Sequence, residues 1–221
     1  RIGSSVVFDP NSFTSPNFPN LQSRAYEDGA RISTNSWGAD TGGAYTTSSQ
    51  AYDALVRDAQ PTGSAEEAEG NQPMVIVFSA GNAGSGANTI GSPGSGKNVF
   101  TVGAAENEHP FGGADGCGVA DTGANSANDV ISFSSRGPND DGRVKPDIQA
   151  PGTHISGGVF QAANVSPVSG NGVAAGCFTA GGVCAGPGSD FWPLAQQWYT
   201  ASSGTSHSAP AVVGALEDWL S

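Results

Sequence analysis

Three apolar runs along the chain predict buried strands. Residues 74–78 form a continuous run, and residues 99–104 and 130–134 form two similar ones, each bordered by turn-forming residues. Such runs are typical of strands that are buried on both faces, as in a parallel sheet. Residues 30–38 alternate like a further strand that ends in a glycine turn, and a short strand is expected within residues 148–155.

Two segments between these strands have helical character. Residues 21–30 predict a helix that stops at Gly29, a typical residue for the end of a helix. Residues 48–60 predict an amphipathic helix, and residues 63–72 are polar and acidic and predict a surface loop. Helices that alternate with strands indicate an α/β fold with a mainly parallel sheet.

The stretch SGTSHSAP at 203–210 precedes the apolar segment 211–220. The segment predicts a helix that is buried on all sides, with Pro210 in its first turn. A serine at the start of a helix can attack a carbonyl carbon while nearby backbone N–H groups stabilise the oxyanion. The alternative is a Ser/Thr cap on a core helix, which is common.

Length and charge exclude several classes. The 221 residues suffice for one domain with a core, and the formal net charge of −12 excludes a nucleic-acid partner, which requires a basic face. No stretch reaches the roughly 20 apolar residues of a membrane span. The charge is typical of a secreted protein or of one that lives in salt. The chain begins abruptly at Arg1 without a signal peptide, so a mature piece or a cut fragment is expected.

The chain has three cysteines. Cys177 and Cys184 enclose a short glycine-containing loop, which predicts a disulfide and an oxidising compartment. Three buried thiols are the alternative. Cys117 is then either free or paired with a cysteine outside this sequence. Residues Gly157–Pro187, which contain the pair, are rich in Gly, Ala, Ser and Val and are interpreted as a loop insertion within a single domain, 1–221.

Asn82 is a candidate for stabilising an oxyanion. It directly follows the buried strand at 74–78, in the small-residue sequence SAGN, and sites form at the carboxyl ends of parallel strands. Its side-chain amide offers two N–H donors. The alternative for Asn82 alone is a turn residue.

Five motifs occur in order along the chain, and together they resemble one family. They are NSWG at 35–38, SAGN at 79–82, FSSRGP at 133–138, KPDIQAPG at 145–152 and SGTSHSAP at 203–210. The set resembles the C-terminal two-thirds of the catalytic domain of a subtilisin-like serine protease (subtilase, peptidase family S8). YTT at 45–47 and DGRVKPD at 141–147 are most similar to the oxidatively stable alkaline proteases of bacilli. The implied fold is α/β, subtilisin-like, with a mainly parallel sheet flanked by helices and its N-terminal strands missing.

The resemblance assigns roles to particular residues. Ser206 is the expected nucleophile, and the Asn82 side chain and the Ser206 N–H form the expected oxyanion hole. The expected substrate-binding residues lie on the segments around them: Ser36, Trp37 and Gly38, which pair with the substrate backbone; Ser79, Ala80 and Gly81, which line the specificity pocket; Pro93, which closes that pocket after a cis Ser92–Pro93 bond; and Gly204 and Thr205, which precede the nucleophile.

The catalytic Asp and His of the family are absent from their usual contexts. Asp40-Thr41-Gly42 and Asp121-Thr122-Gly123 lie in polar loops and not after buried strands, which also argues against a pepsin-like aspartic protease. His109 and His154 lack the expected motif, and His207 directly follows the nucleophile. The Asp and the His are therefore expected outside this chain, and the chain alone is expected to be inactive.

Two further expectations follow from the resemblance. His207 stands where many relatives carry methionine, and histidine cannot form a sulfoxide, so tolerance to peroxide is expected. Calcium is the expected cofactor, and Asp115, Asp121 and Asp129 lie in an oxygen-rich loop that is a candidate site. A solvated acidic loop is the alternative for these three.

The leading hypothesis is a secreted serine endopeptidase that acts on polypeptides. One alternative is a catalytically inactive binding module with the same fold. A sedolisin-type acid peptidase is disfavoured, because that family has an aspartate where this chain has Asn82. An open sheet edge is expected, covered by the missing N-terminal segment, by another copy of the chain or by a rearranged N-terminus.

Overall fold

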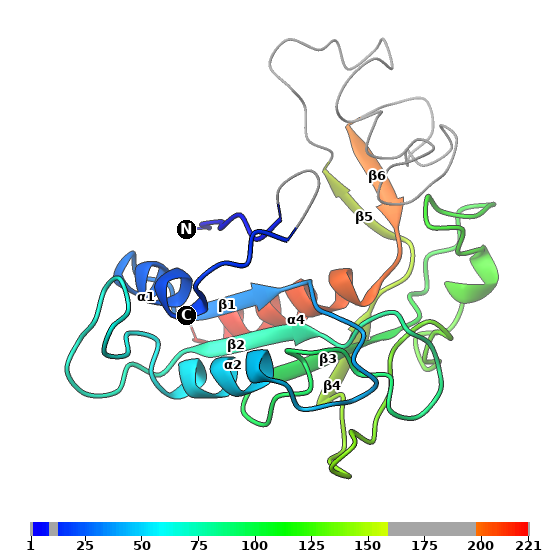
Figure 1. Cartoon of the computed structure of the whole chain (residues 1–221). Coiled ribbons are helices and arrows are strands. Elements are labelled where there is room, and N and C mark those ends of the chain that lie inside the picture. Colours follow the sequence, from blue (N-terminus) through cyan, green and yellow to red (C-terminus); the bar gives the residue numbers. More distant parts are fainter. Residues whose placement is uncertain (1, 9–12, 159–197, 221) are drawn as a thin grey trace.

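The computed structural model describes residues 2–8, 13–158 and 198–220 (Figure 1). Within them lie three α-helices, a short 3₁₀ helix and six strands. In chain order they are α1 (Phe18–Glu27), β1 (Ile32–Asn35), α2 (Thr47–Arg57), β2 (Val75–Ser79), β3 (Phe100–Ala105), η1 (Asp121–Gly123), β4 (Ile148–Pro151), β5 (Ile155–Gly158), β6 (Tyr199–Ser202) and α4 (Thr205–Leu220).

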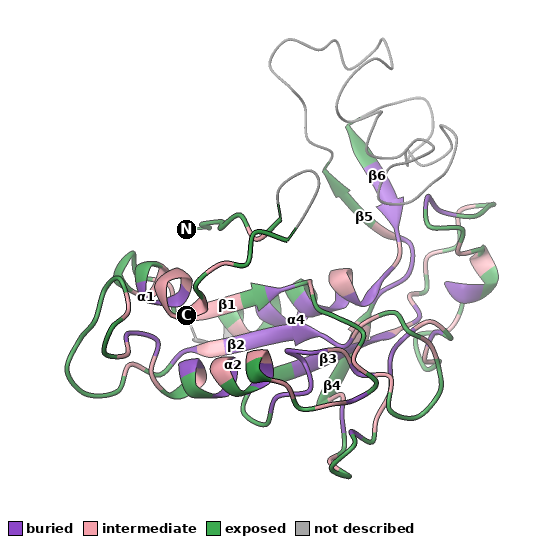
Figure 2. Ribbon diagram, viewed as in Figure 1, coloured by how far each residue is buried: buried purple, intermediate pink, exposed green. Residues whose placement is uncertain are grey.

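A four-stranded parallel sheet in the order β1-β2-β3-β4 forms the centre of the molecule. Figure 2 shows that β2 is buried along most of its length, as its continuous apolar run predicts. Successive residues of β2 face opposite sides: Ile76 and Phe78 contact one core cluster, and Val77 contacts another. The prediction of an α/β fold with a mainly parallel sheet is confirmed.

The first core cluster lies between the sheet and α2. Tyr52 and Leu55 of α2 pack against Phe78 and Ile76, and all four side chains are at most 2% exposed. The Tyr52 and Phe78 rings meet edge to face with centroids 4.8 Å apart. Thr46 and Ser49 form a capping box at the start of α2, so the helix begins at Thr47, one residue before the predicted start.

The second core cluster lies between the opposite face of the sheet and α4. Val212 and Val213 of α4 pack against Val77 and Val102. The prediction that this helix is buried on all sides is wrong, because its other face is exposed at Pro210, Ala211, Gly214 and Ala215. The sheet covers only one side of α4, so the other side faces solvent. The small residues on that side keep the exposed apolar area low.

One predicted strand is absent, and one strand was not predicted. Residues 130–134 form turns and make only an isolated bridge from Val130 to Ala105. The Ser134 hydroxyl, and not a neighbouring strand, accepts the hydrogen bond from the Ala104 N–H. Conversely, Tyr199–Ser202 forms β6, which pairs antiparallel with β5 and leads directly into the SGTS sequence.

Of the three cysteines, Cys117 is the one that lies among the described residues. Cys117 is disulfide-bonded. The expected pairing of Cys177 with Cys184 stays a prediction. Those two residues, and all of the predicted insertion Gly157–Pro187 beyond Gly158, lie outside the described residues.

We expect Phe78→Ala to lower the free energy of unfolding by about 3–5 kcal/mol, because it removes a fully buried ring from between α2 and the sheet. Val144→Ala, at a side chain that is 84% exposed, is the control and should change the free energy by less than about 0.5 kcal/mol. Urea unfolding followed by fluorescence measures both. Equal effects of the two substitutions would contradict the assignment of this core.

Candidate active site

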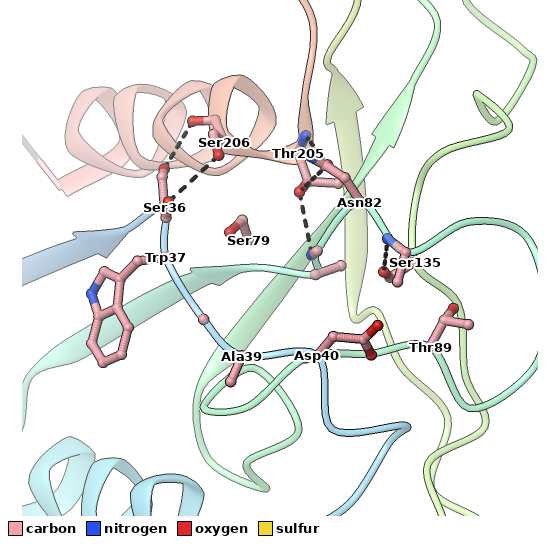
Figure 3. Close-up of a pocket in the computed structure, with 15 residues that line it drawn as sticks. Ser36, Trp37, Ala39, Asp40, Ser79, Asn82, Thr89, Ser135, Thr205 and Ser206 are labelled. Atoms are coloured by element: carbon pink, nitrogen blue, oxygen red, sulfur yellow. Dashed lines mark hydrogen bonds between the residues drawn. The ribbon is translucent and has the colours of Figure 1, made fainter. Parts of the chain in front are cut away.

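Three segments that are distant in sequence meet at the carboxyl ends of β1 and β2 (Figure 3). Ser36–Gly38 follows β1, Ala80–Asn82 follows β2, and α4 begins at Thr205. Because β1 and β2 are parallel, both segments leave the sheet at the same end of the strands. The start of α4 lies at this end of the sheet as well, so its N–H groups face the space between the two segments.

Ser206 is the second residue of α4. Pro210 lies inside the helix and not in its first turn as predicted. Because proline has no N–H, the Ser206 carbonyl oxygen lacks the donor that a helix normally supplies four residues on. The Ser36 hydroxyl replaces that donor and hydrogen-bonds to the Ser206 carbonyl at 2.8 Å. The Ser206 hydroxyl in turn lies 3.5 Å from the Ser36 carbonyl oxygen. Pro210 thereby couples the candidate nucleophile to the end of β1.

Asn82 is fixed by Thr205. Its side-chain oxygen accepts hydrogen bonds from the Thr205 N–H at 3.0 Å and from the Thr205 hydroxyl at 2.9 Å. The same hydroxyl accepts a hydrogen bond from the Gly81 N–H at 3.2 Å. With the oxygen held in this way, the Asn82 NH₂ group is the part of the amide that remains for a ligand. A Cβ at Gly204 would lie 3.4 Å from Asn82 Nδ2, so glycine keeps the space beside this donor open.

These segments enclose a pocket of about 410 Å³. Residues 36–40 form one wall, residues 79–83 form the other, and Thr205 and Ser206 lie at its mouth; Thr89, Gly91 and Ser135 complete the lining. Nine of the predicted site residues line it together: Ser36, Trp37, Gly38, Ser79, Ala80, Gly81, Asn82, Thr205 and Ser206.

Pro93 and Gly204 do not line the pocket. The Ser92–Pro93 bond is cis, as predicted. Pro93 lies behind the wall, where Ser92 exchanges two backbone hydrogen bonds with Ala39, at 2.8 and 2.9 Å. This loop therefore supports the wall formed by residues 36–40, and Gly91 takes the lining position.

Trp37 is held from both sides. Its indole N–H donates to the Asn35 side-chain oxygen at 3.2 Å, and its ring stacks on Phe18 of α1 with centroids 5.6 Å apart. Asn35 is itself anchored, because its NH₂ donates to the Val77 carbonyl on β2. The wall of the pocket is thus tied to the sheet.

The buried carboxylate of Asp115 holds the turn that precedes Ser206. Asp115, 5% exposed, accepts a short hydrogen bond from the Ser203 hydroxyl and further bonds from the Cys117 and Val119 N–H groups, both at 3.0 Å. The Ser203 oxygen accepts a hydrogen bond from the His154 N–H at 3.0 Å. No local pattern in the sequence indicates this positioning contact, because Asp115 and Ser203 are 88 residues apart.

The histidines lie away from the pocket. None of His109, His154 and His207 is among the described residues that line it. His154 is fully buried, and its ring nitrogens face the carbonyl oxygens of His109 and Val119. The His207 ring contacts the Ser202 hydroxyl at 2.6 Å, and burial lowers the pKa of His207, with an opposing effect from Asp115.

The two Asp-Thr-Gly sequences lie in different positions relative to the pocket. Asp121 accepts backbone hydrogen bonds that lower its pKa, foremost from Phe111, and it lies 3.7 Å from His154, outside the pocket. Asp40, by contrast, lines the same pocket as Ser206. Its polar loop predicts an exposed residue, and Asp40 is exposed. Only the fold brings it to the pocket.

Calcium is the cofactor predicted for the loop that carries Asp115, Asp121 and Asp129. Among the described residues, no group of three or more His, Cys, Asp or Glu side chains is placed to hold a metal ion. The oxygens of Asp115 and Asp121 are taken up by N–H and O–H donors. Calcium stays a prediction from the family resemblance.

The subtilase family profile (Peptidase_S8) matches residues 1–217. The chain belongs to the subtilase family. It is 40% identical over 82 residues to the serine protease AprX of Bacillus subtilis (strain 168) and 39% identical over 90 residues to pyrolysin of Pyrococcus furiosus. Each match spans 37% of this chain but only 16% of AprX and 6% of pyrolysin, so these subtilases are much longer proteins.

Solved subtilase-like structures share the fold. The prenylagaramide maturation protease PagA superposes with a TM-score of 0.51 at 18% identity, over 94% of this chain and 50% of that one. A lanthipeptide protease superposes with a TM-score of 0.51 at 16% identity, over 94% and 52%. The predicted subtilisin-like architecture is confirmed. None of the helices within the described ranges has the length and apolar character that crossing a membrane requires.

We expect the free energy of unfolding to decrease as the pH falls below 6.5, the ordinary pKa of histidine, and to go on decreasing down to the lowered pKa of His207. In that range the unfolded chain binds a proton at His207 and the folded chain does not, so protonation favours unfolding. His207→Gln removes this contribution, and its stability should depend less on pH in this range. Urea unfolding from about pH 8 to about pH 5 measures the difference. Identical pH dependence would show that His207 titrates normally in the folded chain.

Proposed function

We propose that the chain carries the nucleophile and the oxyanion hole of a subtilase that cleaves polypeptides through an acyl-enzyme on Ser206. The family assignment supports a serine peptidase. The observation that carries the finer proposal is the contact between Asn82 and Thr205, which directs an amide donor to the first turn of α4, where Ser206 lies.

In the proposed reaction, the Ser206 oxygen attacks the carbonyl carbon of the scissile bond. The carbonyl π electrons move to its oxygen, which the Asn82 NH₂ and the Ser206 N–H stabilise together with the partial positive charge of the helix N-terminus. The Ser206 hydroxyl proton passes to a general base and from there to the departing nitrogen. Collapse of the intermediate then expels the amine and leaves an ester on Ser206, which water hydrolyses with the same base taking the proton of the water. Ser36–Gly38 supports the substrate by adding its backbone as a strand.

The proposal places the general base outside the lining of this pocket, since none of the described residues that form it is a histidine. A serine without a base is a weak nucleophile, so the chain by itself reacts slowly. The same observation favours the second candidate function, a subtilase fold that binds peptides without cleaving them. Chemical labelling of Ser206 separates the two.

The surroundings of the site support further parts of the proposal. The disulfide at Cys117 favours an exported protein, because disulfides persist in oxidising compartments. Within the described part of the chain, β1 pairs only with β2 and forms an edge of the sheet. A segment preceding this sequence, or a second copy, covers that edge in the working protein.

We expect a fluorophosphonate probe to label Ser206 in the longest natural form of the protein and to label the isolated chain far more slowly. Ser206→Ala should abolish labelling. Asn82→Ala should slow it about 10²–10³-fold, the loss in kcat that removal of an oxyanion-hole donor causes in subtilisin. Labelling rates are followed by intact-protein mass spectrometry.

Asn71→Ala, in the exposed loop after α2, is the matched control and should label at the wild-type rate. Failure of the longest natural form to label at all would support the peptide-binding module. An unchanged rate for Asn82→Ala would remove Asn82 from the oxyanion hole.

We expect His207→Met to make the peptidase activity sensitive to peroxide, because a methionine next to Ser206 can form a sulfoxide and histidine cannot. The only natural methionine, Met74, is 3% exposed in the first core cluster and is protected. Activity is assayed after timed exposure to peroxide. Wild-type protein that loses activity as fast as the variant would refute the protective role of His207.

A further inference from the structure

The pocket beside Ser206 contains a single charged side chain. Among the described residues that line it, Asp40 is acidic, none is basic, and the others are small, aromatic or polar without charge. Figure 3 shows the Asp40 carboxylate at the end of the pocket away from Ser206, which is the end that a long substrate side chain would reach. The pocket therefore presents one negative charge to whatever enters it.

The Asp40 carboxylate is available to a ligand. Its side chain is exposed, and its one hydrogen bond within the described ranges is a long one from the Gly42 N–H, at 3.4 Å. No described lysine, arginine or histidine forms an ion pair with it. No basic side chain in the described part of the chain neutralises the Asp40 carboxylate, so its charge is available to a ligand.

The backbone on both sides of Asp40 holds it at the pocket. Ala39 exchanges two hydrogen bonds with Ser92, at 2.8 and 2.9 Å, and the Gly43 N–H donates to the Ile90 carbonyl at 3.1 Å. Ser92 and Ile90 flank Gly91, which lines the pocket. Backbone hydrogen bonds thus hold the loop that carries Asp40 against residues 90–92 at two points.

The remainder of the lining suits a long cationic side chain. Gly81, Gly91 and Ala80 have little or no side chain, which keeps about 410 Å³ open. A Cβ at position 91 would lie 2.9 Å from the Ala39 carbonyl oxygen, so glycine is required where the two loops meet. The hydroxyl oxygens of Ser79 and Ser135 can accept hydrogen bonds from an ammonium or guanidinium group.

We propose that Asp40 is a specificity-determining residue, and that this pocket prefers a lysine or arginine side chain on the residue that precedes the scissile bond. The inference rests on the proposed function, because it concerns the bond that Ser206 attacks. A glutamate side chain would meet the Asp40 charge and be rejected. The net charge of −12 acts in the same direction, since it attracts basic polypeptides.

The first experiment compares peptide anilides that differ only in the residue before the scissile bond, which is Lys, Gln or Glu. With the longest natural form of the protein, we expect kcat/KM for Lys to exceed that for Gln about tenfold, with Glu lowest, and the preference to shrink as salt is added. Asp40→Asn should lower the value for Lys to that for Gln.

Asp140→Asn is the matched control, since it removes the same charge from an exposed loop residue that does not line the pocket. It should keep the wild-type preference. Equal kcat/KM values for Lys and Gln in the wild type, or the same loss in both variants, would overturn the role of Asp40.

The second experiment separates this inference from the proposed function. Binding of benzamidine, a cation, and of benzamide, its neutral counterpart, is measured by calorimetry on Ser206→Ala protein, which has no nucleophile. We expect benzamidine to bind about tenfold more tightly, and Asp40→Asn to remove the difference. If no peptide is cleaved but benzamidine still binds through Asp40, the proposed function fails and the cation site stands. Equal binding of the two compounds overturns the cation site, whatever the peptidase activity.

Discussion

The contact between the Asn82 amide and Thr205 is the interaction on which the site depends. It joins the carboxyl end of β2 to the first turn of α4, and it orients the NH₂ of Asn82 by occupying the oxygen of the same amide. An oxyanion donor is useful only if it is fixed before the charge develops. The second tie, from the Ser36 hydroxyl to the Ser206 carbonyl, exists because Pro210 leaves that carbonyl without its helical partner.

The loop around Asp115 holds the turn that precedes Ser206, the proposed nucleophile. Asp115 binds the Ser203 hydroxyl, and His154 donates its N–H to the same oxygen. Cys117, two residues further along this loop, is disulfide-bonded. The turn before Ser206 is therefore held by the sheet through Asn82 and by the Asp115 loop through Ser203.

The pocket shows how a shared family scaffold acquires its own chemistry. Its walls are built from backbone and small side chains, which the subtilase motifs at 35–38 and 79–82 supply. Such walls accept many side chains. Asp40 is the one charged side chain among the described residues that line the pocket, and the proposed preference for basic side chains rests on it.

The sequence alone determined the α/β class, the strands β1 to β4 and the residues around Ser206 and Asn82. Buried parallel strands and contiguous motifs leave their signal within a few neighbouring positions. Only the tertiary structure decided that residues 130–134 form turns, because the Ser134 hydroxyl takes the place of a strand partner for Ala104. It alone showed that Cys117 is disulfide-bonded, that Asp115 holds Ser203 and that Asp40 enters the pocket. Each of these depends on contacts between residues far apart in the chain, and no local pattern of hydrophobic and polar positions encodes such contacts.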